Sequence, residues 1–128
     1  MQGATALLCA LAVGACGEDG SAETSVNAED FDPANFDQPT EVDNRWFPLE
    51  PGTRFTYQGS AVADGGRDPR RVVFTVTDLT KVVNGVRTLV AWDRDYGSGE
   101  LQETELAFFA QDNDGNVWNL GEYPEEYE

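Results

Sequence analysis

Hydrophobic and polar positions alternate with a period of two through most of residues 53–121, which is the pattern of half-buried β-strands. The clearest part is residues 71–96, where two runs rich in β-branched and aromatic residues flank Asn84-Gly85. Asn-Gly favours a two-residue type I′ turn, because both turn residues need a positive φ. The pattern therefore predicts a β-hairpin at the centre of the folded part.

Further strands are expected on both sides of this hairpin, since turn residues separate the remaining apolar runs. The predicted strands are residues 53–59, 71–83, 86–96, 100–111 and 116–121. Residues 60–70 contain two glycines and a proline and are expected to form a loop. Asp78-Leu79 is expected to form a bulge, because it interrupts the alternation of the second strand.

Residues 100–111 also suit a short helix, because Glu, Leu, Gln and Ala favour helices. A strand is preferred here, since Phe108-Phe109 leads into a turn at residues 112–115. The predicted fold class is all-β, a small antiparallel meander sheet of about five strands that could be an incomplete barrel or sandwich. The domain is expected to span residues 44–128 and to be incomplete at its C-terminus, because the last residues are polar and two sheet edges stay open.

The N-terminal part of the chain has a different pattern. Residues 1–15 are apolar and end in small residues, which is typical of a signal peptide and too short for a membrane-spanning helix. Residues 16–43 are acidic and rich in Gly, Ser, Ala, Pro and Asn, which predicts a flexible linker. Within it, Phe31 and Phe36 are exceptions that could dock on the domain or form one short turn.

A short motif lies between these two segments. Val13-Gly14-Ala15-Cys16 resembles the lipobox of bacterial lipoproteins, and it directly follows the apolar run. The resemblance implies that Cys16 is lipidated after cleavage and that the protein is extracytoplasmic, held at the cell membrane or outer membrane by its lipid. The alternative is an ordinary signal peptide with an incidental cysteine. The start departs from the pattern, since Met1-Gln2-Gly3 carries no Lys or Arg.

Composition excludes several classes of function. The formal net charge is −16, with 24 acidic and 8 basic residues, so a nucleic-acid partner is not expected. The chain has no histidine, which removes the commonest general base and zinc ligand. Its two cysteines, Cys9 and Cys16, both precede the folded part, which therefore has no disulfide or thiol nucleophile.

Three sets of residues in the folded part form a recognisable pattern: Asn44-Arg45-Trp46-Phe47-Pro48-Leu49 with Pro51-Gly52-Thr53, then Asn84-Gly85-Val86, and most specifically Ala110-Gln111-Asp112 with Gly115-Asn116-Val117-Trp118 and Gly121-Glu122. Through them, residues 44–122 resemble a group of uncharacterised bacterial secreted proteins. The resemblance implies a β-rich extracytoplasmic domain and no particular activity.

The turn after the fourth predicted strand has oxygen-bearing side chains at alternate positions. Asp112, Asp114 and Asn116 could contribute to a Ca²⁺ site, since Ca²⁺ takes six to eight oxygen ligands. The spacing is not that of an EF-hand, and Asn, Asp and Gly are also the residues expected in a hairpin turn.

Acidic and aromatic residues give two further candidates. Asp93 and Asp95 share one strand face, as do Glu103 and Glu105 of the next strand, and paired carboxylates can hydrolyse glycosides. The alternative is a solvated acidic face that discourages aggregation. Separately, aromatic residues could form a ligand-binding platform, foremost Trp92, Tyr96 and Trp118 and also Trp46, Tyr57 and Tyr123, although aromatic residues also fill small β cores.

These observations favour a lipid-anchored cell-envelope domain that is a non-catalytic binding or structural module. Its expected partners are the membrane, through Cys16, and an envelope protein or small molecule. No cofactor is expected other than Ca²⁺. The alternatives are a glycosidase-like hydrolase that uses carboxylates, and a calcium-stabilised surface domain.

Overall fold

The computed structural model describes residues 30–63 and 65–127. Residues 31–128 form one compact unit, which holds the sheet. The signal peptide, Cys16 and most of the predicted linker lie outside the described residues. No helix of the described part is long and apolar enough to cross a membrane.

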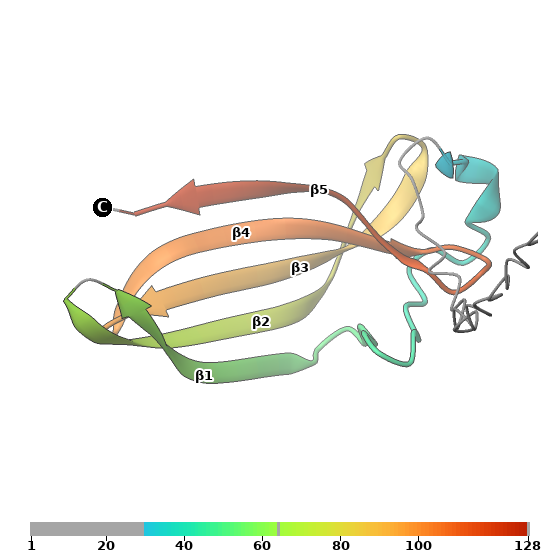
Figure 1. The fold of residues 1–128 in the computed structure, drawn as a ribbon. Coiled ribbons are helices and arrows are strands. Elements are labelled where there is room, and N and C mark those ends of the chain that lie inside the picture. The colour runs from blue at the N-terminus through green and yellow to red at the C-terminus, as the bar shows by residue number, and fades with distance from the viewer. Residues whose placement is uncertain (1–29, 64, 128) are drawn as a thin grey trace, which may run out of the picture. The chain divides into compact units, whose positions relative to one another are not determined.

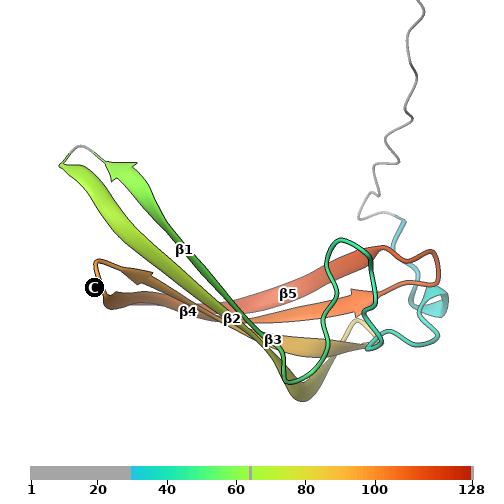
Figure 2. The same cartoon turned by 90° about the horizontal axis from the view of Figure 1, so that it is seen from below.

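Five antiparallel strands form one open sheet in meander order (Figure 1). The strands are β1 (Arg54–Ala63), β2 (Gly66–Val83), β3 (Val86–Gly97), β4 (Glu100–Gln111) and β5 (Val117–Glu126). The prediction of a small all-β meander is confirmed, including a strand rather than a helix at residues 100–111. Figure 2 shows the strong twist of the sheet, with β1 and β2 crossing the direction of β4 and β5.

The predicted turns are present. Asn84 and Gly85 have φ values of 48° and 84°, as a type I′ turn requires. Ser98 and Gly99 connect β3 to β4 with φ values of 50° and 92°. The predicted bulge in β2 is also present, since the register with β3 shifts between Val76 and Thr80.

The strands are longer than predicted at the end of the sheet formed by the β1–β2 and β3–β4 turns. Residues 60–70 do not form the expected loop, because Ser60, Ala61 and Val62 pair with residues 67–69 of β2. Strand β5 likewise continues past Gly121 to Glu126, paired with residues 103–107 of β4. Backbone pairing thus extends the β1–β2 hairpin through residues predicted as a loop, and the β4–β5 hairpin through polar residues beyond the last predicted strand.

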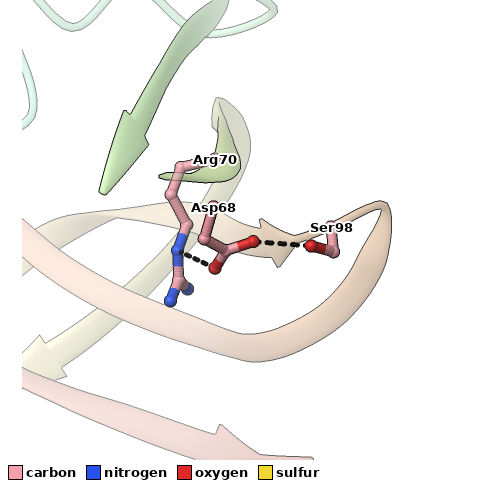
Figure 3. A network of polar contacts seen from close by, with 3 residues as sticks. All are labelled: Asp68, Arg70 and Ser98. Atoms are coloured by element: carbon pink, nitrogen blue, oxygen red, sulfur yellow. Dashed lines mark hydrogen bonds and ion pairs between the residues drawn. The ribbon is translucent and has the colours of Figure 1, made fainter. Parts of the chain in front are cut away.

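A polar network fixes this end of the sheet (Figure 3). Asp68 on β2 forms an ion pair with Arg70 at 3.0 Å and accepts a hydrogen bond of 2.6 Å from the Ser98 hydroxyl. Ser98 also donates its backbone N–H to Pro69. The β3–β4 turn is therefore attached to β2.

The N-terminal residues 31–49, termed here the wrapping segment, differ from the linker expected up to residue 43. A 3₁₀ turn, η2 (Pro33–Asn35), begins this segment and is capped by Asp32, whose side chain accepts from Ala34 N. The segment lies at the end of the sheet that carries the β2–β3 and β4–β5 turns (Figure 1). The folded unit therefore begins near Phe31 rather than at residue 44.

The wrapping segment covers both faces of the sheet at this end. On one face, Val42 and Leu49 pair as an isolated bridge and pack with Val76 and Leu89. On the other face, Phe36 packs with Val86 and Ala110. The apolar residues of the segment are buried here, since Phe36, Val42 and Leu49 are 9%, 5% and 1% exposed.

Candidate functional site

The two faces of the sheet have different chemistry where the wrapping segment does not cover them. Directly opposite residues of an antiparallel pair share a face, and neighbours along a strand alternate. Asp93 pairs with Glu105 and Asp95 with Glu103, which places all four carboxylates on one face. Trp92 pairs with Leu106 on the opposite face. We name these the acidic face and the aromatic face.

The acidic face contains a shallow depression of about 130 Å³. It is lined by Val72, Asp93, Asp95, Glu103 and Glu105. The structure therefore brings together the carboxylates that the sequence places on adjacent strands. One oxygen of Asp93 and one of Asp95 are buried and have no hydrogen-bond partner.

The environment of Asp93 and Glu105 disfavours their charged forms. Burial raises the pKa of Asp93, and the nearby charge of Asp95 raises it further, against the opposing effect of the Arg94 backbone amide. The pKa of Glu105 is also raised, first by burial and then by Glu122, Asp93 and Glu103. Like charges directly opposite each other destabilise a strand pair, so the folded unit holds this cluster at a cost in stability.

The aromatic face carries a row of large apolar side chains across three strands. Trp92 on β3, Leu106 on β4 and Tyr123 on β5 lie directly opposite one another in register. They are 39%, 39% and 58% exposed. We name them the apolar row. They line a groove of about 460 Å³ together with Thr104, Glu105, Pro124 and Glu125.

Cationic side chains support the apolar row. The Arg94 guanidinium lies 4.1 Å from the centre of the Trp92 ring, and Lys81 Nζ lies 4.6 Å from that of Tyr123. Lys81 also donates a 2.8 Å hydrogen bond to the Tyr123 hydroxyl. Trp92 Nε1 donates to Thr104 Oγ1 at 2.6 Å. These contacts fix the orientation of both aromatic rings while their outer surfaces remain exposed.

The three aromatic residues predicted as a platform do not form one surface. Trp92 and Tyr96 lie at the uncovered end of the aromatic face, where Arg71 stacks on Tyr96 at 4.1 Å. Trp118 lies at the covered end, opposite Ala110, and packs against Phe31 and Phe36 of the wrapping segment. The sequence pattern missed Leu106, and only the register places Leu106 and Tyr123 beside Trp92.

The predicted calcium residues form the turn between β4 and β5. Asp112 Oδ1 accepts from the backbone N–H groups of Asp114 and Asn116, at 3.0 and 2.8 Å. Asp112 Oδ2 accepts from Asn116 Nδ2 and Trp118 Nε1, at 3.0 and 2.8 Å. Both carboxylate oxygens of Asp112 are therefore occupied by internal donors.

Burial alone would raise the pKa of Asp112, which is 6% exposed. The hydrogen bonds from Trp118, Asn116 and the two backbone amides outweigh burial and lower its pKa below the usual range. The charged form of Asp112 is thus part of the folded structure.

The rest of this turn binds the wrapping segment. Asp114 Oδ2 accepts from Asn35 Nδ2 at 3.2 Å, and Asn44 Nδ2 donates to the Gly115 carbonyl at 2.7 Å. The backbone N–H of Asn113 donates to the Asn35 carbonyl, and Asn113 Oδ1 accepts from the backbone N–H of Asp37. Within residues 30–63 and 65–127, no group of three or more acidic, histidine or cysteine side chains has the geometry of a metal site. The contacts favour a structural turn over a calcium site.

Comparison with protein-family models, with curated proteins and with solved structures gives no match.

Proposed function

We propose that the protein is a non-catalytic binding module of the cell envelope, lipid-anchored through Cys16, whose uncovered aromatic face holds a partner. The observation that carries this proposal is the apolar row, Trp92, Leu106 and Tyr123. Contiguous exposed apolar side chains on a soluble domain mark interaction sites more often than isolated ones do.

The composition of the row supports a binding role. Trp, Tyr and Arg are the residues that most often dominate binding energy at interfaces, and Trp92, Tyr123 and Arg94 occur together here. Their rings are already oriented by hydrogen bonds to Thr104 and from Lys81, so little side-chain freedom is lost on binding.

The groove suits an apolar or aromatic group that carries a polar edge. Trp92 and Leu106 offer apolar surface, and Thr104, Glu125 and Lys81 supply donors and acceptors at its border. Its volume is within the range of small-molecule sites. A side chain of a protein partner or a small amphipathic ligand would fit the same chemistry.

The test is site-specific photo-crosslinking in the envelope of cells that produce the full chain. A photoreactive amino acid at Tyr123 is expected to give one discrete adduct, and Trp92→Ser is expected to reduce its yield about 30-fold, as loss of a 2 kcal/mol anchor would. The matched control is Val82, which is 56% exposed against 58% for Tyr123 and lies on the other face. Equal crosslinking at both positions, or no effect of Trp92→Ser, would contradict the proposal.

The acidic depression supports a second candidate, a hydrolase that uses carboxylates. It contains four carboxylates, and the raised pKa of Glu105 and Asp93 is what a general acid needs near neutral pH. Against this candidate, Trp92 and Tyr123 lie on the opposite face, although Tyr57 on the acidic face, opposite Val72, is also exposed.

Two single variants separate the candidates. Asp93→Asn, at a residue that lines the acidic depression and not the groove, should abolish any hydrolysis of chromogenic glycosides by the purified chain while leaving crosslinking at Tyr123 intact. Trp92→Ser should have the converse effect. Glycoside hydrolysis that persists in both Glu105→Gln and Asp93→Asn would remove the hydrolase candidate.

A further inference from the structure

The two edge strands of the sheet differ in how they are protected. An edge strand presents unpaired backbone groups to any other extended chain, and proteins block such edges with proline, charged residues or irregular pairing. In the described part of the chain, β1 and β5 are the edges, and each pairs on one side only.

Strand β5 has all three kinds of protection. Pro124 lacks a backbone N–H, and Glu122, Glu125 and Glu126 are exposed and acidic. Its pairing with β4 is irregular between Ala107 and Phe109. A second strand at this edge would meet repulsion and an interrupted row of donors.

Strand β1 has almost none of this protection. Its sequence, RFTYQGSAVA, contains one charged residue and no proline, and residues 51–63 contain no acidic residue. Its pairing with β2 is regular over all ten residues. Tyr57 and Val62 are 58% and 82% exposed.

The hydrogen-bond pattern identifies which groups of β1 face outward. Val76 donates its N–H to the Thr53 carbonyl, and Gly52 donates to the Val76 carbonyl. Bonded and non-bonded pairs alternate in an antiparallel ladder, so the N–H groups of alternate residues from Arg54 onward point away from β2. Pro69, which has no backbone N–H to donate, lies opposite Ser60 at a non-bonded pair, as this alternation requires.

Charge indicates which partner this edge accepts. Copies of a chain with a net charge of −16 repel each other. Of the two edges, β1 carries no carboxylate and β5 carries three, so two copies meet less repulsion along β1. In an antiparallel pair of identical strands, the Arg54 side chains lie at opposite ends and do not meet. Such a pair has two-fold symmetry, which is the commonest arrangement of homo-oligomers.

We propose that β1 pairs antiparallel with β1 of a second copy of this chain, joining two five-stranded sheets into one continuous sheet. The pairing leaves the apolar row on β3, β4 and β5 uncovered, so it is independent of the proposed function. Raising the ionic strength strengthens the pairing, because salt screens the repulsion between the acidic copies.

The test is disulfide crosslinking of the full chain with Cys9 and Cys16 replaced by serine. Single Thr56→Cys, Gln58→Cys and Ser60→Cys chains are oxidised, and at least one is expected to form a covalent dimer several-fold faster than a Val82→Cys control. The yield is expected to rise between about 20 mM and 500 mM salt. Equal yields at all four positions would overturn the proposal.

A second set of variants tests the same edge by sedimentation equilibrium. Gln58→Pro removes one outward donor, as Pro124 does on β5, and Gln58→Lys adds a charge to the edge. Both are expected to reduce dimerisation at least tenfold. Gln58→Lys also makes the net charge less negative, which by itself would favour association. A loss of dimer in this variant therefore cannot be an effect of net charge. Val82→Lys, which adds the same charge away from the β1 edge, is the matched control. A monomeric parent chain at about 100 µM, which would place any dissociation constant above this value, would overturn the proposal.

Discussion

At the scale of single residues, the Asp112 carboxylate accepts four hydrogen bonds, three from Asp114 and Asn116 within the β4–β5 turn and one from Trp118 on β5. Asp112→Asn would turn an amide N–H₂ toward the donors Trp118 Nε1 and Asn116 Nδ2. We expect this variant to lower the free energy of unfolding by about 2–3 kcal/mol, the range for bonds to a buried charged group. Asp114→Asn, at an exposed residue of the same turn, is the control and should cost less than about 1 kcal/mol.

The pH dependence of this effect follows from the lowered pKa of Asp112. A carboxyl whose pKa is lower in the folded state stabilises the fold above its unfolded pKa, and this contribution is lost as the pH falls through the folded pKa. The difference between the parent chain and Asp112→Asn, measured by urea unfolding, should be constant above about pH 5 and shrink below about pH 4. A melting temperature that rises with millimolar Ca²⁺ would instead support the calcium interpretation.

The acidic face should respond to pH in the opposite direction. Asp93 and Glu105 have a raised pKa in the folded state, so the fold gains stability as the pH falls toward that pKa. Asp93→Asn and Glu105→Gln are expected to raise the free energy of unfolding at pH 7 by about 0.5–1 kcal/mol each, the scale of a cross-strand pair. The gain should disappear near pH 4. A loss of stability at pH 7 in both variants would contradict this account of the cluster.

At the scale of elements, the wrapping segment completes both cores. Phe36 is buried with Val86 and Ala110, and its ring lies 6.1 Å from that of Trp118. Phe36→Ala should lower the free energy of unfolding by about 3 kcal/mol, as large-to-small changes in cores do. Thermal unfolding monitored by circular dichroism measures this, and Val62→Ala, at a side chain 82% exposed, should change little.

The elements also show what the sequence could predict. Turn residues and the two-residue alternation were sufficient to predict the Asn84-Gly85 hairpin and the five strands, because these signals lie within a few neighbouring residues. The role of the wrapping segment depends on isolated apolar residues in an acidic stretch, with no periodicity to indicate a buried face. Phe31 and Phe36 around Asp32-Pro33 were the available signal.

The candidate site was likewise predictable only where its residues are close together in the sequence. Alternation predicted that Asp93 and Asp95 share a face, as do Glu103 and Glu105, and the register places the four together. The apolar row could not be predicted, because it depends on the pairing of three strands and on an irregularity between Ala107 and Phe109 that shifts β5. Trp118 was grouped with Trp92 by residue type, whereas the wrapping segment separates their environments.

At the scale of the whole molecule, the lipobox resemblance predicts that the folded unit is held outside the cytoplasm on a tether. Cys16→Ser should move the protein from the membrane fraction to the soluble fraction, since it removes the predicted site of acylation. Immunoblotting of fractionated cells measures this. A protein that remains in the membrane fraction after Cys16→Ser would contradict the anchor.

The wrapping segment covers one end of the sheet and leaves the other end free for the proposed binding surface, and this arrangement is central to the proposed function. Amide hydrogen exchange of the full chain tests it most directly. The N–H groups of Leu49, Gln111 and Asn113, which bond to Val42, Pro39 and Asn35, are predicted to exchange as slowly as those in the middle of β3. Exchange at the rate of a free peptide would mean that the segment is not part of the fold and would contradict the account.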